Sequence, residues 1–278
     1  MSHPVNPEED GAHMAFDESM SYGDYLKLGR VLNAQEPLSD AHDELLFIIQ
    51  HQTSELWMKL AIHELRTAAA GLDGDDIRPC FKMFSRVARI FEQLNSAWDV
   101  LRTMTPSEYL KFRDSLQKSS GFQSYQYREI EFLVGNKNRA MLRPHAHVPE
   151  VHALLTECLV QPSLYDRVTF LLARRGFDIP PELLDRDWSV THVSHPAIRE
   201  AWRQIYSNPG EHWQLYELAE KLIDFEDYFR RWRFNHLLTV QRIIGSKRGT
   251  GGTSGVAYLD KMLSVVLFPE LWEVRADL

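Results

Sequence analysis

The stretch LYELAEKLIDFEDYFRRWRFNHLLTVQRII, residues 215–244, decides the fold class. Apolar residues recur in it at spacings of three and four, which is the pattern of one face of a helix. That face comprises Leu218, Leu222, Phe225, Phe229, Trp232, Val240 and Ile243. The same spacing places His236 among them. We therefore expect a long helix over residues 211–245 with a histidine in its buried face.

Helical periodicity recurs along the chain, whereas the alternating β-branched runs typical of strands are scarce. Residues 40–70 are apolar on nearly all sides, which predicts a buried helix. No internal repeat or low-complexity linker divides the chain. The sequence predicts one all-α domain of long packed helices over residues 21–278, preceded by a mobile polar tail, residues 1–20. Further helices are predicted at about 76–103, 106–118, 123–134, 148–160, 163–175 and 196–207.

Composition excludes several classes of protein. The 278 residues carry a formal net charge of −8, which disfavours non-specific nucleic-acid binding. Cys80 and Cys158 lie far apart, so a disulfide framework, a zinc finger and covalently attached haem are all disfavoured. An uncharged apolar run of about 18 residues is absent, and residues 1–20 lack the apolar region of a secretory signal. We expect a cytoplasmic protein with no membrane span.

His236 admits two interpretations. A buried imidazole commonly forms a hydrogen bond to a backbone carbonyl within the core. Alternatively, a neutral imidazole among aromatic side chains suits an axial ligand of haem iron, with Phe229 and Trp232 lining the porphyrin. Neither cysteine has the glycine-flanked pattern of a thiolate ligand, so a P450-like site is not supported.

A second histidine interrupts FIIQHQTSELWMK, residues 47–59. Gln50, His51 and Gln52 are polar in a segment otherwise suited to a core, and Phe47 lies one helical turn before His51. Burying these groups without partners costs a few kcal/mol. They therefore form either a hydrogen-bond network between helices or part of a ligand site.

Tyr109 and Arg113 are also one helical turn apart, so both side chains can reach a common point. The planar guanidinium suits a carboxylate because it donates two parallel hydrogen bonds, and the tyrosine hydroxyl can complete the recognition. The alternative is an exposed helix face with an ordinary surface arginine.

The loop GSKRGTGGTSG, residues 245–255, follows the long helix. It matches neither the phosphate-binding P-loop nor the dinucleotide-binding glycine motif, since neither pattern is complete and no strand precedes it. It is either an exposed connector or a lid that closes over a ligand, with Thr250 at its tip. Lys247 and Arg248 could then pair with anionic groups such as haem propionates.

A histidine cluster at residues 145–152 resembles a metal site at first sight. His145, His147, Glu150 and His152 lie close in sequence, but Pro144 and Pro149 interrupt the segment, and no helical HExxH spacing occurs. We do not expect a metal site there.

Three blocks, FIIQHQTSELWMK, SEYLKFRDSLQKSSGFQSYQYREIEFLVGNK and WRFNHLLTVQRIIGSKRGTGGTSGVAYL, closely resemble the tryptophan 2,3-dioxygenase family in its compact bacterial form. SYGDYLKL at residues 21–28 agrees with it, and the likeness covers nearly everything after about residue 20. The resemblance implies a cytoplasmic, all-helical homotetramer with non-covalent haem b, one per subunit and active as ferrous iron. Its members insert both atoms of O₂ across the indole C2–C3 bond of L-tryptophan. The product is N-formyl-L-kynurenine, in the first step of the kynurenine pathway.

The resemblance also assigns roles to residues. His236 is the proximal iron ligand, and the other residues at the haem are Trp232, Gly249, Gly251 and Gly252. His51 is the catalytic residue; it hydrogen-bonds the indole N–H and either accepts its proton or only orients the ring. Arg113 binds the carboxylate, and Thr250 meets the amino-acid end as the loop closes. The remaining substrate-binding residues are Phe47, which packs on the indole, Ile48, Ile49, Gln50 and Tyr109, and, from a neighbouring subunit's N-terminal segment, Tyr22, Tyr25 and Leu26.

One residue departs from the family pattern. Asn235, just before the iron ligand, replaces a residue that is basic in relatives, which puts propionate pairing or redox tuning in doubt but leaves the ligand in place.

The alternative function is another histidine-ligated haem protein, a peroxidase or a gas sensor. Peroxidases fix the proximal histidine with a carboxylate, and no acidic residue lies within one turn of His236 in the sequence. A gas sensor would need neither an arginine that binds a carboxylate nor a glycine-rich loop that closes over a substrate.

Overall fold

The computed structural model of the chain describes residues 6–278 and confirms the all-α fold. Within this range there is no β-strand. The four 3₁₀ helices are η1 (Arg113–Leu116), η2 (Gly121–Gln123), η3 (Arg139–His145) and η4 (Val274–Ala276). The α-helices are α1 (Tyr22–Leu26), α2 (Leu28–Val31), α3 (His42–Gly71), α4 (Arg78–Leu101), α5 (Pro106–Phe112), α6 (Tyr125–Val134), α7 (Pro149–Val160), α8 (Leu164–Arg174), α9 (Pro181–Leu184), α10 (Pro196–Ser207), α11 (Trp213–Ile244), α12 (Val256–Leu263) and α13 (Pro269–Glu273).

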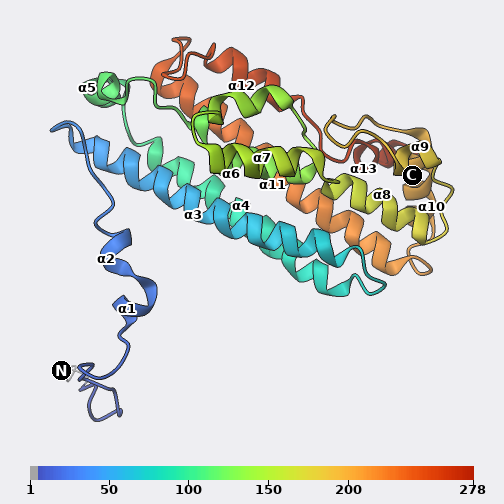
Figure 1. Cartoon of the computed structure of the whole chain (residues 1–278), viewed down its shortest axis with the longest axis horizontal. Helices are drawn as coiled ribbons and strands as arrows, with labels where there is room; N and C mark the ends of the chain where they lie inside the picture. Colours follow the sequence, from blue (N-terminus) through green and yellow to red (C-terminus); the bar gives the residue numbers. More distant parts are fainter. Residues whose placement is uncertain (1–5) are drawn as a thin grey trace.

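Three long helices, α3, α4 and α11, form the centre of the molecule, and α4 packs against both of the others (Figure 1). The buried side chains of α4 recur every three or four residues, which gives it a continuous apolar face. Phe91 on this face packs edge-on against Phe229 of α11, with ring centroids 5.1 Å apart. Aromatic pairs in this geometry add stabilisation beyond that of buried area alone. This aromatic contact thus helps to hold α4 against α11.

The C-terminal segment is anchored to α11 by a buried carboxylate. Glu226 accepts hydrogen bonds from the backbone N–H groups of Leu267 and Phe268, at 2.6 and 3.0 Å, and from Trp272 Nε1 at 2.9 Å. Burial raises the pKa of Glu226, and these donors partly offset the rise. This anchoring holds the end of the chain on the helix that carries His236.

The predicted helices are confirmed, with one shortened. The helix predicted over residues 106–118 ends at Phe112 and continues as η1. Glu108 supports the start of this helix, because it accepts a hydrogen bond from Thr105 N at 2.7 Å. The short helices α1, α2, α9, α12 and α13 were not predicted from periodicity, since they have too few turns to show it.

The expectation that α3 is buried on all sides is wrong for the single chain. Its outer face carries an exposed apolar stripe, with side chains 37–56% exposed, formed by Leu45, Ile49, Leu56 and Leu60. A helix that is apolar all round needs cover on every face, and one chain supplies it on the inner face only.

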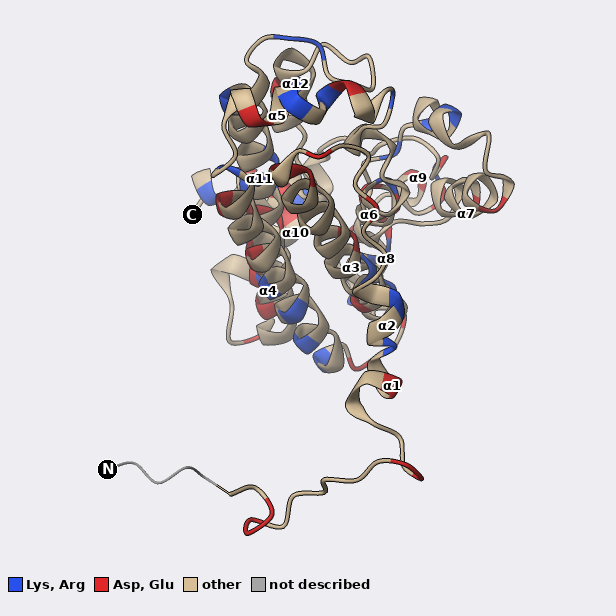
Figure 2. Ribbon diagram, turned by 90° about the vertical axis from the view of Figure 1, so that its left-hand side faces the viewer, with Lys and Arg blue, Asp and Glu red and all other residues tan. Residues whose placement is uncertain are grey.

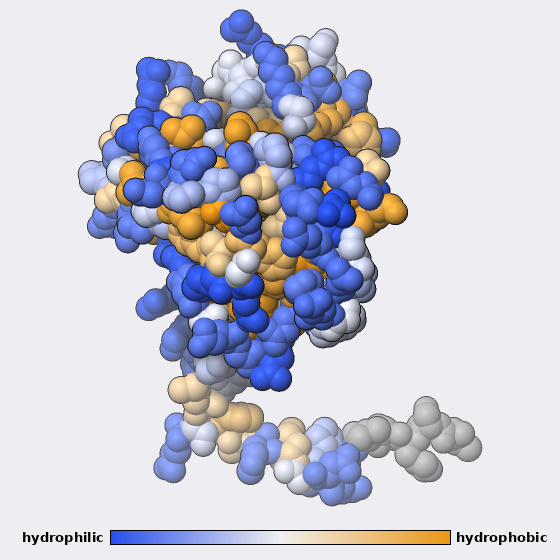
Figure 3. Space-filling model, turned by 90° about the vertical axis from the view of Figure 1, so that its right-hand side faces the viewer, coloured by the Kyte–Doolittle hydropathy of each residue, from blue (hydrophilic) through white to orange (hydrophobic). Residues whose placement is uncertain are grey.

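The N-terminal segment extends away from the helical body (Figures 1 and 3). It contains α1 and α2, on which Tyr22 and Tyr25 are 75% and 73% exposed. Residues 1–5 of the predicted tail lie outside the described residues, and the mobility expected for residues 1–20 stays a prediction.

Over the rest of the molecule, charges of both signs are interspersed along the helices (Figure 2). In the described part of the chain, no helix has the length and apolar character that crossing a membrane requires.

Candidate functional site

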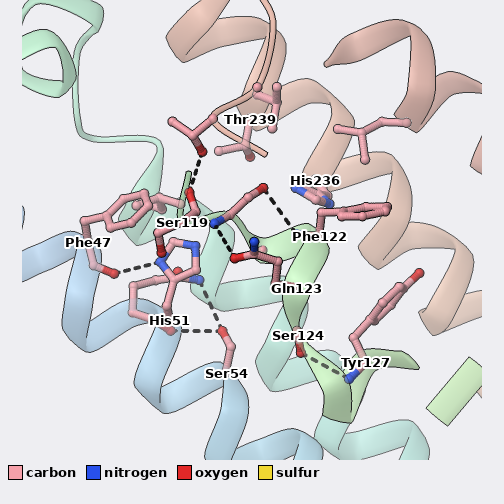
Figure 4. Close-up of a pocket in the computed structure, with 18 of the residues that line it drawn as sticks. Phe47, His51, Ser54, Ser119, Phe122, Gln123, Ser124, Tyr127, His236 and Thr239 are labelled. Atoms are coloured by element: carbon pink, nitrogen blue, oxygen red, sulfur yellow. Dashed lines mark hydrogen bonds between the residues drawn. The ribbon is translucent and has the colours of Figure 1, made fainter. Parts of the chain in front are cut away.

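A cavity of about 640 Å³ lies between α3, α4 and α11, and loops 117–124 and 245–255 form part of its wall. Cavities of this size commonly hold small-molecule ligands or cofactors. His51 comes to it from α3 and His236 from α11 (Figure 4). Two histidines that are 185 residues apart in sequence therefore face the same cavity.

Most of the residues predicted for the site line this cavity. They are Phe47, Ile48, Gln50, His51, Tyr109, Trp232, His236, Gly249 and Thr250. Arg113, Gly251 and Gly252 lie next to lining residues without lining it themselves. Ile49 lies on the exposed stripe of α3, and the segment carrying Tyr22, Tyr25 and Leu26 does not reach the cavity of its own chain.

His51 is held by a hydrogen bond within its own helix. Its Nδ1 lies 2.7 Å from the carbonyl oxygen of Phe47, and the Phe47 ring lies against the imidazole with centroids 4.2 Å apart (Figure 4). Because a carbonyl only accepts, Nδ1 must carry the proton. Burial lowers the pKa of His51, although the Phe47 carbonyl and Glu55 act against the shift. The ring is therefore neutral, and its Nε2 is a hydrogen-bond acceptor.

His236 is held differently. Within residues 6–278, neither of its ring nitrogens makes a hydrogen bond, so the interpretation as a hydrogen-bonded core histidine is not supported. Instead, its ring stacks on Trp98 of α4 with centroids 4.9 Å apart and planes 12° apart, and Trp232 packs at 5.6 Å. Burial lowers the pKa of His236 to about 4. The imidazole is thus neutral near pH 7 and keeps a lone pair without a partner.

These features fit a haem. A metal bound by protein alone needs several ligands, and among residues 6–278 no group of three or more His, Cys, Asp or Glu side chains is placed to hold one. A single neutral imidazole can hold iron if a porphyrin supplies the other ligands. The cavity beside His236 offers the space, with Trp98 and Trp232 among its walls.

Tyr109 and Arg113 lie where α5 passes into η1. Burial raises the pKa of Tyr109, and the neighbouring Arg113 partly offsets this rise. The Arg113 Nη2 donates to the carbonyl oxygen of Arg248 at 2.9 Å, which ties η1 to the glycine loop. Its Nε is buried and donates to no group in the part of the chain that the structure describes. Part of this guanidinium is therefore available to an additional acceptor.

The glycine loop packs against residues 117–124. The Thr250 hydroxyl donates to the carbonyl oxygen of Ser119 at 2.6 Å. A Cβ at Gly251 would lie 2.8 Å from Ser120 Cβ, and one at Gly255, where φ is +61°, would lie 2.7 Å from the Lys247 carbonyl oxygen. Only glycine permits these approaches. The loop thus forms part of the cavity wall through Gly249, Thr250, Thr253 and Gly255, while five of its other residues are exposed.

Sequence reasoning missed a buried charged cluster. Arg128 of α6 and Arg233 of α11 line the cavity, and both pair with Glu131, which is fully buried. Arg233 is not one of the residues on the predicted apolar face of this helix, and an arginine elsewhere on a helix is normally solvated. Its position beside Trp232 was the one signal that could have placed it near the cavity.

Asn235 faces α4 and does not line the cavity. Its Nδ2 donates to Asn95 Oδ1 at 2.8 Å, and its Oδ1 accepts from Arg102 Nη2 at 2.8 Å. The residue that departs from the family pattern thus joins the two helices that carry His236 and Trp98.

Comparisons with known proteins identify the family of the chain. The family profile described as tryptophan 2,3-dioxygenase matches residues 7–204 and 189–278. A protein of that name from Bradyrhizobium sp. strain BTAi1 is 66% identical over 275 residues, covering 99% of each chain. Another from Bradyrhizobium diazoefficiens is 61% identical over 277 residues, covering 100% of this chain and 99% of that protein. A third, from Ruegeria pomeroyi, is 59% identical over 280 residues, covering 100% of each. The family resemblance predicted from the sequence is confirmed.

Proposed function

Because the chain belongs to the tryptophan 2,3-dioxygenase family, we propose that it is a haem-dependent oxidoreductase that inserts both atoms of O₂ across the indole C2–C3 bond of L-tryptophan. The product is N-formyl-L-kynurenine, in the first step of tryptophan degradation by the kynurenine pathway. The observation that carries the proposal is the pair of neutral histidines in one cavity. In the described part of the chain, the nitrogens of His236 make no hydrogen bond, whereas His51 presents a fixed acceptor.

His236 holds the iron of non-covalent haem b, one per subunit. Its low pKa keeps the lone pair available for the metal at neutral pH. Trp232 and the loop glycines Gly249, Gly251 and Gly252 lie beside the cofactor. When bound, the ferrous haem supplies the centre that binds and activates O₂.

His51 orients the indole. Its Nε2 accepts a hydrogen bond from the indole N–H, because Nδ1 is already committed to the Phe47 carbonyl. Phe47 packs on the indole, and Ile48 and Gln50 complete this wall. The lowered pKa of His51 makes it a weaker base than an ordinary histidine, which favours orientation over full proton removal.

Arg113 recognises the carboxylate of the amino acid. Its unpartnered Nε supplies a donor for this purpose, and Tyr109 lies beside it. The same guanidinium holds the Arg248 carbonyl oxygen, so carboxylate binding and closure of the glycine loop share one group. Thr250 on that loop meets the amino-acid end. Holding the substrate at both ends removes much of the entropy cost of bringing its C2–C3 bond to the activated O₂.

The active unit comprises residues 21–278 and assembles as a cytoplasmic homotetramer. Two exposed apolar surfaces support assembly, namely the stripe on α3 and the segment carrying Tyr22, Tyr25 and Leu26. That segment extends away from its own body, as a segment that completes a neighbouring site must. Ile49 lies on the α3 stripe and not at the cavity, so its side chain belongs to this proposed assembly surface.

Addition of L-tryptophan to the ferrous protein in air tests the proposal. We expect formation of N-formyl-L-kynurenine, measured by its absorbance and by mass spectrometry with ¹⁸O₂, which labels both inserted oxygens. A haem spectrum without this product would indicate a gas sensor or a peroxidase. A purified protein that binds no added haem would refute the proposal.

A further inference from the structure

We propose that Trp98 is a positioning residue for His236. The face of its indole, in place of a hydrogen bond, fixes the plane of the imidazole that holds the iron. This inference rests on the proposed function, since it concerns how the iron ligand is kept in place.

The stack is close and nearly parallel. The rings of Trp98 and His236 lie 4.9 Å apart with an angle of 12° between their planes. Trp232 packs against both rings, at 5.6 Å from each, with planes inclined by 46° to the imidazole and 48° to Trp98. The imidazole thus lies in a corner formed by two indoles, and only the Trp98 face runs parallel to it.

An imidazole without hydrogen bonds needs such a restraint. The torsion that turns a histidine ring about its Cβ–Cγ bond has broad minima, so side-chain geometry alone does not fix the ring plane. A metal-binding histidine usually has a hydrogen bond from its second nitrogen that fixes its orientation. Among residues 6–278, no group makes this bond to His236. The parallel indole face restricts the same rotation, because turning the ring would drive its edge into Trp98.

The helix that carries Trp98 is pinned to the helix that carries His236. Arg102, one turn after Trp98, donates from Nη2 to Asn235 Oδ1 at 2.8 Å and from Nε to Thr239 Oγ1 at 2.9 Å. Asn235 and Thr239 lie on either side of His236 in sequence. These bonds hold α4 and α11 at a fixed offset, so the stack stays in register without a hydrogen bond to either ring. The Trp98 N–H is itself buried without a partner within the described chain.

Two variants separate the indole face from the indole N–H. Trp98→Phe keeps an aromatic face and removes the N–H, whereas Trp98→Leu removes both. Phe91→Leu is the matched control, because Phe91 also lies on the buried face of α4 and packs on α11 but touches neither histidine. It reproduces the loss of aromatic core packing without disturbing the stack.

The rate of haem transfer to excess apomyoglobin and the electron paramagnetic resonance spectrum of the ferric protein are the readouts. Loss of one aromatic pair predicts haem release about three- to tenfold faster in Trp98→Leu. We also expect a broader ferric signal, since the imidazole samples several orientations. Trp98→Phe should stay close to the unmodified protein in both measurements, and Phe91→Leu should lower thermal stability without broadening the signal.

Three results would decide against the inference or its premise. Equal haem release and equal line shape in Trp98→Leu and Phe91→Leu would refute the stack as a restraint. A Trp98→Phe variant as impaired as Trp98→Leu would show that the N–H, and not the face, is what matters. His236→Ala tests the premise separately, because haem retention in that variant would refute the proposed ligand itself.

Discussion

The two pocket histidines, His51 on α3 and His236 on α11, face the same cavity but are held in different ways. His51 donates a hydrogen bond from Nδ1–H to a backbone carbonyl oxygen of its own helix. His236 has no hydrogen bond among residues 6–278; its ring stacks on the face of Trp98 and packs at an angle against Trp232. A hydrogen bond fixes the tautomer and leaves one defined acceptor for a substrate N–H. Stacking fixes the plane and leaves the nitrogens available to a metal.

Charge does not distinguish the two rings. Burial lowers the pKa of both, and His236 is lowered to about 4, so both are neutral near pH 7. The difference in role therefore comes from the partners of each ring. Substitutions that remove one partner at a time test whether these partners determine the two roles.

The largest effect is expected from His236→Ala. Removing the proposed iron ligand should abolish stable haem binding, so the purified variant should lack a Soret band and show no dioxygenase activity. His51→Ala should retain the haem spectrum, since His51 is assigned to the substrate. Haem loss in His51→Ala with retention in His236→Ala would reverse the two roles.

Arg113→Ala tests the substrate side of the cavity. Truncating one partner of a buried charge pair costs about 2–5 kcal/mol, which predicts an increase in KM of about 30-fold or more. The haem spectrum without substrate should not change. Arg113→Lys is the control, because it keeps the charge but loses the fork, and it should restore only part of the affinity. Steady-state kinetics measure both variants, and an unchanged KM for Arg113→Ala would contradict the assignment.

His51→Ala should have a smaller effect. An orienting hydrogen bond is worth about 1 kcal/mol, so kcat/KM should fall roughly fivefold to tenfold, against the ~10²–10⁴-fold expected of a general base. The loss should disappear with 1-methyl-L-tryptophan, which has no indole N–H. If the variant is equally impaired on both substrates, the hydrogen bond to the indole is not the role of His51.

The smallest effect is expected from pH. A histidine whose pKa is lowered in the folded protein stays neutral above that pKa and loses its ability to bind iron as the pH falls through it. With a pKa of about 4 for His236, haem retention should be constant from pH 8 to pH 5 and should be lost near or below pH 4. Spectrophotometric titration measures this. Haem loss between pH 7 and pH 6 would show that burial does not protect the ring.

The sequence was sufficient for features that repeat along a helix. The spacing of apolar residues places His236 on the buried face of α11, because that relation is local. The pairing of Tyr109 with Arg113 was predictable for the same reason. Roles in binding came from the family resemblance, which the comparisons confirm at the level of the family.

Features that depend on which helices cross could not be predicted. Trp98 and His236 are 138 residues apart, and their stack exists because α4 and α11 pack at one particular offset. The bond from Arg113 to the Arg248 carbonyl depends on where a glycine loop folds back. Similarly, α3 has apolar residues on nearly all sides, so its sequence did not indicate which face a single chain leaves exposed.

A crystal structure of the haem-loaded protein with L-tryptophan tests the central claim most directly. We expect iron bonded to the imidazole of His236, with Trp98 parallel to that ring and the indole N–H of the substrate at His51 Nε2. Iron held by another residue, or tryptophan bound with its indole away from His51, would contradict it.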